Sequence, residues 1–126
     1  MKFTTPDEAR QGQPADTEHF TGPATLRALH RTEEPNPVSV GLVRFEPGTR
    51  NHWHRHRGGQ FLHVVEGEGW VQGRGEPPRR IRIGDSVSTG PGEEHWHGAG
   101  AEAPMAHLAV SIGDITWLEP SEGAPT

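Results

Sequence analysis

Short runs of alternating apolar and polar residues recur along the chain, and glycine or proline separates most of them. The clearest run covers residues 38–46. Its side chains divide between two strand faces, with Val38, Val40 and Leu42 on one face and Gly41, Val43 and Phe45 on the other. Because side chains on a strand alternate with a period of two, this pattern predicts a β-strand with two distinct faces.

The same reasoning predicts a series of further strands. They cover residues 24–31, 51–56, 60–65, 70–72, 79–83, 86–89, 94–97, 105–112 and 115–118. The Gly-rich segment 66–69 is interpreted as a tight reversal between two of them. No stretch shows a convincing 3.6-residue period, so very little helix is expected. Many short strands joined by turns indicate an all-β domain.

The ends of the chain differ from its middle. Residues 1–18 are polar and unpatterned and are expected to form a flexible arm, and residues 119–126 a flexible tail. Between them, residues 19–118 are expected to form one domain. A chain of 126 residues is long enough for one modest hydrophobic core but not for two.

Composition excludes several kinds of chemistry. The chain has no cysteine and no tyrosine, which removes thiolate metal ligands, thiol nucleophiles and a phenolic acid. Its formal net charge of -5 gives no support for nucleic-acid binding. No apolar run approaches the length that a membrane span needs, and no signal peptide is evident at the start. A cytoplasmic protein with no nucleic-acid or membrane partner is therefore expected.

Histidines dominate the polar chemistry, and four residues can supply ligands to one metal ion. His54 and His56 are separated by one residue, so they project from the same face of a strand. A glycine pair follows and lets the chain turn, so that Gln60 opens the next strand and points back. His95 arrives from far along the sequence. A shifted pair, His52 and His54, is an alternative on the same face.

Two motifs carry a resemblance to a known family. The first is Gly48-x5-His54-x-His56-x3-Gln60-x6-Gly67, and the second is Gly84-x5-Gly90-x-Gly92-x2-His95. They resemble the two motifs of the cupin superfamily, over roughly residues 20–118. Gly90 stands where a proline is usual, Ala99 where an asparagine is usual, and Gln60 where most metal-binding cupins carry Glu. The resemblance implies a single-domain antiparallel β-barrel of the jelly-roll type.

Within the superfamily, residues 54–62 and 91–99 are similar to those of small bacterial manganese-dependent hydroxynitrile lyases, which tolerate Gln at the fourth ligand position. This resemblance implies a divalent metal on His54, His56, Gln60 and His95, with His107 close to the open coordination positions. It also implies one metal ion per subunit, Mn first with Ni, Fe or Zn as alternatives, and a homodimer. A neutral amide ligand leaves the ion its full charge, which suits Lewis-acid chemistry.

Three further histidines need separate interpretations. His107 lies in an apolar run and is interpreted as an active-site proton carrier, since a histidine pKa is readily tuned near neutrality. His97 lies two residues after His95 and should point inward as well, either as a catalytic group or as a residue that orients a ligand. The alternative for both is a buried neutral histidine that only packs. His63 shares strand parity with residues opposite to Gln60 and should face away.

The leading hypothesis is a metal-dependent lyase, of the hydroxynitrile lyase type, that acts on a small carbonyl or hydroxyl substrate. His107 would take the hydroxyl proton before the carbon–carbon bond of a cyanohydrin breaks. Residues on two strands are expected to line the substrate pocket, namely Gly41, Val43, Phe45, Leu108 and Ser111. An iron-dependent dioxygenase and a non-catalytic module that binds a metal or small ligand are the alternatives.

Overall fold

The computed structural model describes residues 1–5, 12–33 and 35–123. It contains ten strands and, within the described residues, no helix. The strands are β1 (Gln13–Pro14), β2 (Ala24–Thr32), β3 (Val38–Phe45), β4 (His54–His56), β5 (Gln60–Gly73), β6 (Arg79–Arg82), β7 (Ser86–Thr89), β8 (His95–Ala99), β9 (Met105–Ile112) and β10 (Ile115–Trp117). The prediction of an all-β chain is confirmed. In this part of the chain no helix is long and apolar enough to cross a membrane.

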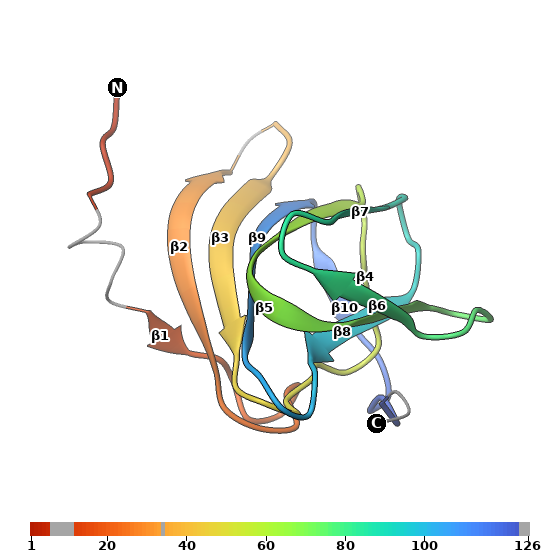
Figure 1. Ribbon diagram of the computed structural model, residues 1–126. Helices are drawn as coiled ribbons and strands as arrows, with labels where there is room; N and C mark the ends of the chain where they lie inside the picture. Colours follow the sequence, from red (N-terminus) through yellow and green to blue (C-terminus); the bar gives the residue numbers. More distant parts are fainter. Residues whose placement is uncertain (6–11, 34, 124–126) are drawn as a thin grey trace.

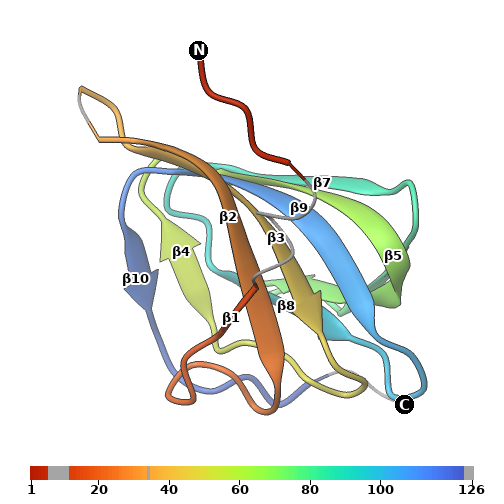
Figure 2. The same ribbon diagram turned by 90° about the vertical axis from the view of Figure 1, so that its left-hand side faces the viewer.

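Every strand pair is antiparallel, and the strands curl into an open barrel. The order across the sheet is β1-β2-β3-β9-β5-β8-β4-β10, with β6 and β7 also paired to β5. Figure 1 shows the curl, and Figure 2 shows β2, β3, β9 and β5 forming one wall while β10, β4 and β8 form the other. Strands that are distant in sequence therefore face one another across one interior.

The register of the first wall decides which side chains point inward. Val43 lies opposite His107, and His107 lies opposite Val64 on the next strand. Directly paired residues share a face of the sheet, so these three side chains point to the same side. Val64 is 1% exposed whereas its neighbour Val65 is 43% exposed. The side that carries His107 is therefore the interior.

Strand β5 crosses from one wall to the other, which corrects the reversal predicted at residues 66–69. The strand bends at an irregularity in its pairing with β9 between Val64 and Glu66. Gly67 follows with a φ of 67°, a conformation that suits glycine. A Cβ on Gly67 would stand 1.9 Å from the Pro104 carbonyl oxygen, so only glycine lets the two backbones approach this closely. Bulges of this kind bend strands at the corners of barrels.

The hydrophobic core fills the end of the barrel below the histidines. Phe45 and Met105 are fully buried and occupy paired positions on β3 and β9. The other members of the core cluster are Ala24, Val64, Val71, Ile81 and Ala99. Burying apolar surface contributes about 25 cal/mol per Å², so this cluster stabilises the walls that hold the polar interior above it.

Both chain ends are more structured than the expected arm and tail. Within the arm, β1 pairs with β2, and Gln13 lies opposite Leu26. Within the tail, Ser121 is only 3% exposed and hydrogen-bonds to the barrel. Residues 6–11 and 124–126 lie outside the described part of the chain. The predicted boundaries of the barrel domain therefore leave out Gln13–Pro14 and Ser121, which both contact it.

Candidate metal centre

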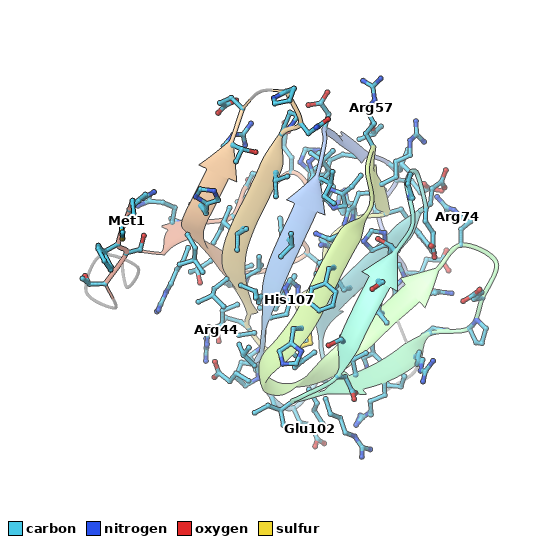
Figure 3. The ribbon with its side chains drawn as sticks, turned by 90° about the horizontal axis from the view of Figure 1, so that it is seen from above. Met1, Arg44, Arg57, Arg74, Glu102 and His107 are labelled. Carbon is cyan, nitrogen blue, oxygen red and sulfur yellow. The ribbon has the colours of Figure 1, made fainter. Side chains whose placement is uncertain are left out.

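Five histidines from three strands meet inside the barrel. Strand β4 contributes His54 and His56, β8 contributes His95 and His97, and β9 contributes His107. None is more than 5% exposed. Figure 3 shows His107 in the middle of the barrel, whereas the labelled arginines project from its periphery. The predicted parity of the β4 and β8 histidines agrees with this arrangement.

His54 lies at the centre of the group. Its ring centroid is 4.3 Å from that of His95 and 5.2 Å from those of both His56 and His97. One ring nitrogen from each of His54, His95 and His97 lies within 4.8 Å of the other two. Three imidazoles at this separation can hold one divalent ion.

Backbone carbonyls fix the protonated nitrogen of two of these rings. His54 Nδ1 lies 2.9 Å from the carbonyl oxygen of His52, and His95 Nδ1 lies 3.0 Å from that of Glu93. A carbonyl oxygen only accepts hydrogen bonds, so each Nδ1 must carry the proton. The Nε2 atom of each neutral ring then presents a lone pair to the interior. Metal-binding histidines are commonly oriented in this way.

The side-chain oxygen of Gln60 lies beside the inward-facing nitrogen of His95. Gln60 Nε2 donates to Ser111 Oγ at 2.9 Å, which leaves Oε1 only 3.0 Å from His95 Nε2. In this amide orientation Oε1 offers a lone pair, and so does Nε2 of a His95 ring that is protonated at Nδ1. One metal cation could accept both lone pairs. The residues present therefore fit a metal.

His56 supplies a second observation in favour of a metal. Both of its ring nitrogens are buried and lack a partner within normal hydrogen-bond limits among the described residues, although the Gln60 side chain lies close enough to act against the lowering of the His56 pKa. Burying an unpaired polar atom costs about 1–3 kcal/mol, and buried histidine nitrogens are normally paired. The ring centroid of His56 lies 5.9 Å from that of His95. Coordination of an ion between the two rings would satisfy one of the orphaned nitrogens.

His97 also contacts residues outside this group. Its Nδ1 lies 3.1 Å from His107 Nε2, and the side-chain amide of Asn51 lies against its ring. Phe45 packs on both histidines, with centroid distances of 5.7 and 5.5 Å. His97 therefore forms a pair with His107 beside the group that surrounds His54.

Burial keeps these histidines neutral. It lowers the pKa of His54 and of His97 well below the usual value of 6.5, and neighbouring histidines lower it further. It lowers the pKa of His56 and of His107 to about 4, and it also lowers that of His95. The cause is that a charged imidazole loses its hydration inside the barrel. Neutral rings are the form that metal binding requires.

The predicted pocket residues divide between the two faces of the wall. Val43, Phe45 and Ser111 share the interior face with His107, whereas Leu108 pairs with Leu42 and lies on the outer face. The inclusion of Leu108 in the pocket was therefore wrong, because adjacent residues on a strand point to opposite sides.

Gly41 is also on the interior face, but the space beside it is filled. A Cβ at this position would lie 3.0 Å from Leu26 Cδ1. Leu26 is 44% exposed, and its register opposite Val43 places it on the same face. Leu26 thus belongs to the interior wall near Gly41, which the sequence pattern did not indicate.

Three residues of the site were not predicted from the sequence. Asn51 contacts His97, Ser121 holds Asn51, and the ring of Trp117 lies 5.0 Å from that of His54. Trp117 pairs with His54 between β10 and β4, and this register places it on the face of the metal ligands. His52 contributes only its carbonyl to the group, and His63 bonds to Ser86 on the outer face.

Comparison with known proteins agrees with this geometry. Residues 41–111 match the family described as the cupin domain. An (R)-mandelonitrile lyase of Granulicella tundricola is 44% identical over 110 residues, which cover 84% of this chain and 82% of that protein. A cupin-like protein of Thermotoga maritima has a TM-score of 0.82 with 38% identity, over 88% of each chain.

One more distant structure shows the fold alone. An acetylacetone dioxygenase of Acinetobacter johnsonii has a TM-score of 0.76 with 15% identity, over 94% of this chain and 78% of that one. The same barrel thus occurs in proteins named for different reactions. Any assignment of chemistry to this chain must come from its own site.

Proposed function

Because this chain belongs to the cupin family, we propose that it is a divalent-metal-binding lyase that cleaves a small cyanohydrin into a carbonyl compound and cyanide. Metal binding is supported above all by the approach of Gln60 Oε1 to His95 Nε2. The two atoms lie 3.0 Å apart inside the barrel, where one ion could bind both. The similarity to a mandelonitrile lyase supports the reaction.

The proposed ligands are His54, His56, Gln60 and His95. His56 is favoured because it stands at the motif spacing from His54 and because, among the described residues, neither of its ring nitrogens has a hydrogen-bond partner. The contact of His97 Nδ1 with His107 does not by itself exclude Nε2 of the same ring, so His97 is the alternative ligand. When bound, the ion would act as a Lewis acid that polarises the substrate oxygen. Manganese is proposed, with Ni, Fe and Zn as alternatives, since imidazole and amide ligands accept all four.

His107 is the proposed proton acceptor. Its Nδ1 is buried with no hydrogen-bond partner in the part of the chain that the structure describes, while its Nε2 faces His97. Burial lowers its pKa to about 4, which keeps the ring neutral at pH 7 but makes it a weaker base than a histidine tuned near neutrality. Transfer of the substrate hydroxyl proton to His107 would be helped by a bound metal ion, which makes that hydroxyl more acidic. As the carbon–carbon bond breaks, its electron pair leaves with cyanide, which takes the proton from His107. His97 can stabilise the intermediate charge on its partner ring.

The interior wall would hold the substrate's organic group. Val43 and Phe45 line the face that carries His107, and Ser111 fixes the amide of Gln60. Leu26 and Gly41 extend this surface toward β2. An apolar wall beside polar groups favours a substrate with one apolar end and one oxygen, and it excludes water from the reacting atoms.

Cleavage of mandelonitrile by the Mn-loaded protein tests this proposal. We expect benzaldehyde to appear, and we expect His107→Ala to lower kcat by about 100-fold, the usual contribution of a general base. His63→Ala is the matched control, because His63 is a histidine on the outer face of the same wall. Metal content and circular dichroism should be measured on all three proteins.

Other outcomes of this assay would favour a different function. Oxygen consumption during turnover would indicate a dioxygenase rather than a lyase. Stable binding of a small ligand without turnover would indicate a non-catalytic module. Equal turnover by the wild type and His107→Ala would remove His107 from the mechanism while leaving the metal site in place.

We also propose that the protein is a cytoplasmic homodimer. The outer face of the first wall supports association, since it carries Leu42, Leu108, Val110 and Phe61, the last of which is 38% exposed. Contiguous apolar surface of this kind is uncommon on monomers. Light scattering is expected to give twice the mass of one chain, and Phe61→Glu is expected to shift it toward the monomer. A monomeric wild type would contradict this part of the proposal.

A further inference from the structure

A chain of buried polar contacts runs from the segment after β10 to the histidine pair. In that segment the backbone oxygen of Ser121 accepts from Arg50 Nε and Nη2 at 3.1 and 2.8 Å. Arg50 Nε also lies 3.0 Å from Ser121 Oγ. That hydroxyl in turn donates to the backbone oxygen of Asn51 at 2.8 Å. Ser121 and Asn51 are each only 3% exposed.

Asn51 then contacts His97 through both its backbone and its side chain. The backbone N–H of Asn51 donates to the carbonyl oxygen of His97 at 3.1 Å. Asn51 Oδ1 accepts from His97 N at 3.0 Å. With its oxygen held there, the amide Nδ2 lies 3.5 and 3.4 Å from the two ring nitrogens of His97. These nearly equal distances place the amide against the ring.

The rings of His54 and His95 pack against the His97 ring at centroid distances of 5.2 and 5.6 Å. Among the described residues, the hydrogen-bonding neighbours of the ring are Asn51 and His107. The Nδ1 atom of His97 lies 3.1 Å from His107 Nε2, and Phe45 packs edge-on at 5.7 Å. The hydrogen bond to His107 forms only while the His97 ring keeps its present rotation about χ2. Without the Asn51 amide, one side of the ring would lose its polar neighbour.

We propose that Asn51 is a positioning residue that fixes the ring of His97 for its hydrogen bond with His107, and that Ser121 holds Asn51 in place. Ser121, in the segment after β10, thereby acts on the histidine pair through Asn51. The expected effect of Asn51 on turnover rests on the proposed lyase function. Its expected effect on the orientation of the His97 ring does not, because that effect is measured in the metal-free protein.

Nuclear magnetic resonance of the histidine rings tests this inference. We would record ¹H–¹⁵N spectra of the imidazoles of chelator-treated protein at pH 8 for the wild type, Asn51→Ala and Ser121→Ala. Ser86→Ala is the matched control, since it removes a serine hydroxyl that bonds to His63 on the outer face. Circular dichroism and thermal unfolding establish that each variant is folded.

In the wild type, His97 and His107 should each show one fixed tautomer. In Asn51→Ala, the two ¹⁵N shifts of His97 should move toward the average of mixed tautomers, and Ser121→Ala should move them less in the same direction. Ser86→Ala should change only His63. If the wild type cleaves mandelonitrile, Asn51→Ala should lower kcat by roughly 10–100-fold with little change in KM, as loss of an outer hydrogen-bond partner does.

Unchanged His97 shifts in folded Asn51→Ala and Ser121→Ala would overturn the inference. Should Asn51→Ala not fold, Ser121→Ala decides alone, because it leaves the Asn51 side chain intact. Failure of the lyase function is distinguished by the absence of turnover in the wild type, in which case the ring spectra still test the positioning role.

Discussion

Replacement of His54 by alanine is expected to abolish metal binding. The His54 ring lies closest to the centre of the group, within 5.2 Å of His56, His95 and His97. Its Nε2 points inward because the His52 carbonyl engages its Nδ1. The loss in affinity should exceed the roughly 10–100-fold that follows removal of an outer partner of a ligand. Elemental analysis of protein purified with added manganese measures it directly.

Gln60→Glu provides the complementary result. Glutamate keeps an oxygen donor at the position of Oε1 and adds a negative charge, so the metal should be retained. The same charge reduces the Lewis acidity of the ion, so turnover of mandelonitrile should fall. Glutamate also cannot donate to Ser111 Oγ as the Gln60 amide does. Loss of metal from Gln60→Glu would contradict the assignment of this residue as a ligand.

Two further variants distinguish the alternative ligand sets. We expect His56→Ala to lose metal and His97→Ala to retain it. The opposite result would mean that His54, His95 and His97, whose ring nitrogens lie within 4.8 Å of one another, form the site instead. His63 lies on the outer face, so His63→Ala should bind metal as the wild type does. It serves as the control for removing one histidine that is not a ligand.

Regular alternation explains which strands were predictable. Residues 86–89 and 105–112 were predicted with the bounds of β7 and β9, and the end of β3 differs by one residue. In these segments burial on one face imposes a period of two on the sequence. The same period predicts inward faces for His54, His56, His95 and His97.

Irregular backbone explains most of what was missed. The Gly-rich segment 66–69 indicates a turn and a bulge equally well, since both need glycine at a positive φ. Asn51 precedes β4 in a segment that forms only an isolated bridge, so strand parity did not reveal its contact with His97. Ser121 follows a proline in a polar segment, and only its tertiary hydrogen bonds show that it is buried.

The metal-free protein is expected to lose stability steeply as the pH falls below about 6.5. Five buried histidines carry lowered pKa values in the fold, His56 and His107 to about 4. In the unfolded chain each titrates near 6.5. Below that pH the unfolded chain binds protons that the folded chain excludes, so acid favours unfolding. The stabilisation is complete above pH 6.5 and is lost as the pH falls toward 4.

The size of the effect follows from proton linkage. Each such histidine contributes a slope of about 1.4 kcal/mol per pH unit between its folded and unfolded pKa values. Because domains of this size are stable by roughly 5–15 kcal/mol, the loss from several such histidines is a large share of the total, and the metal-free protein is expected to be much less stable at pH 5 than at pH 8. Urea unfolding followed by circular dichroism, from pH 8 to pH 5, measures the slope.

Metal and a single variant separate the histidines from other causes of acid unfolding. A bound ion stabilises the fold and keeps its ligands deprotonated, so the loss of stability should move to lower pH in manganese-loaded protein. His107→Gln removes one buried titrating ring and should reduce the slope of the metal-free protein by about 1.4 kcal/mol per pH unit. A stability that does not vary between pH 8 and 5 would show that these rings titrate in the fold as they do in the unfolded chain, and would contradict their burial as neutral groups.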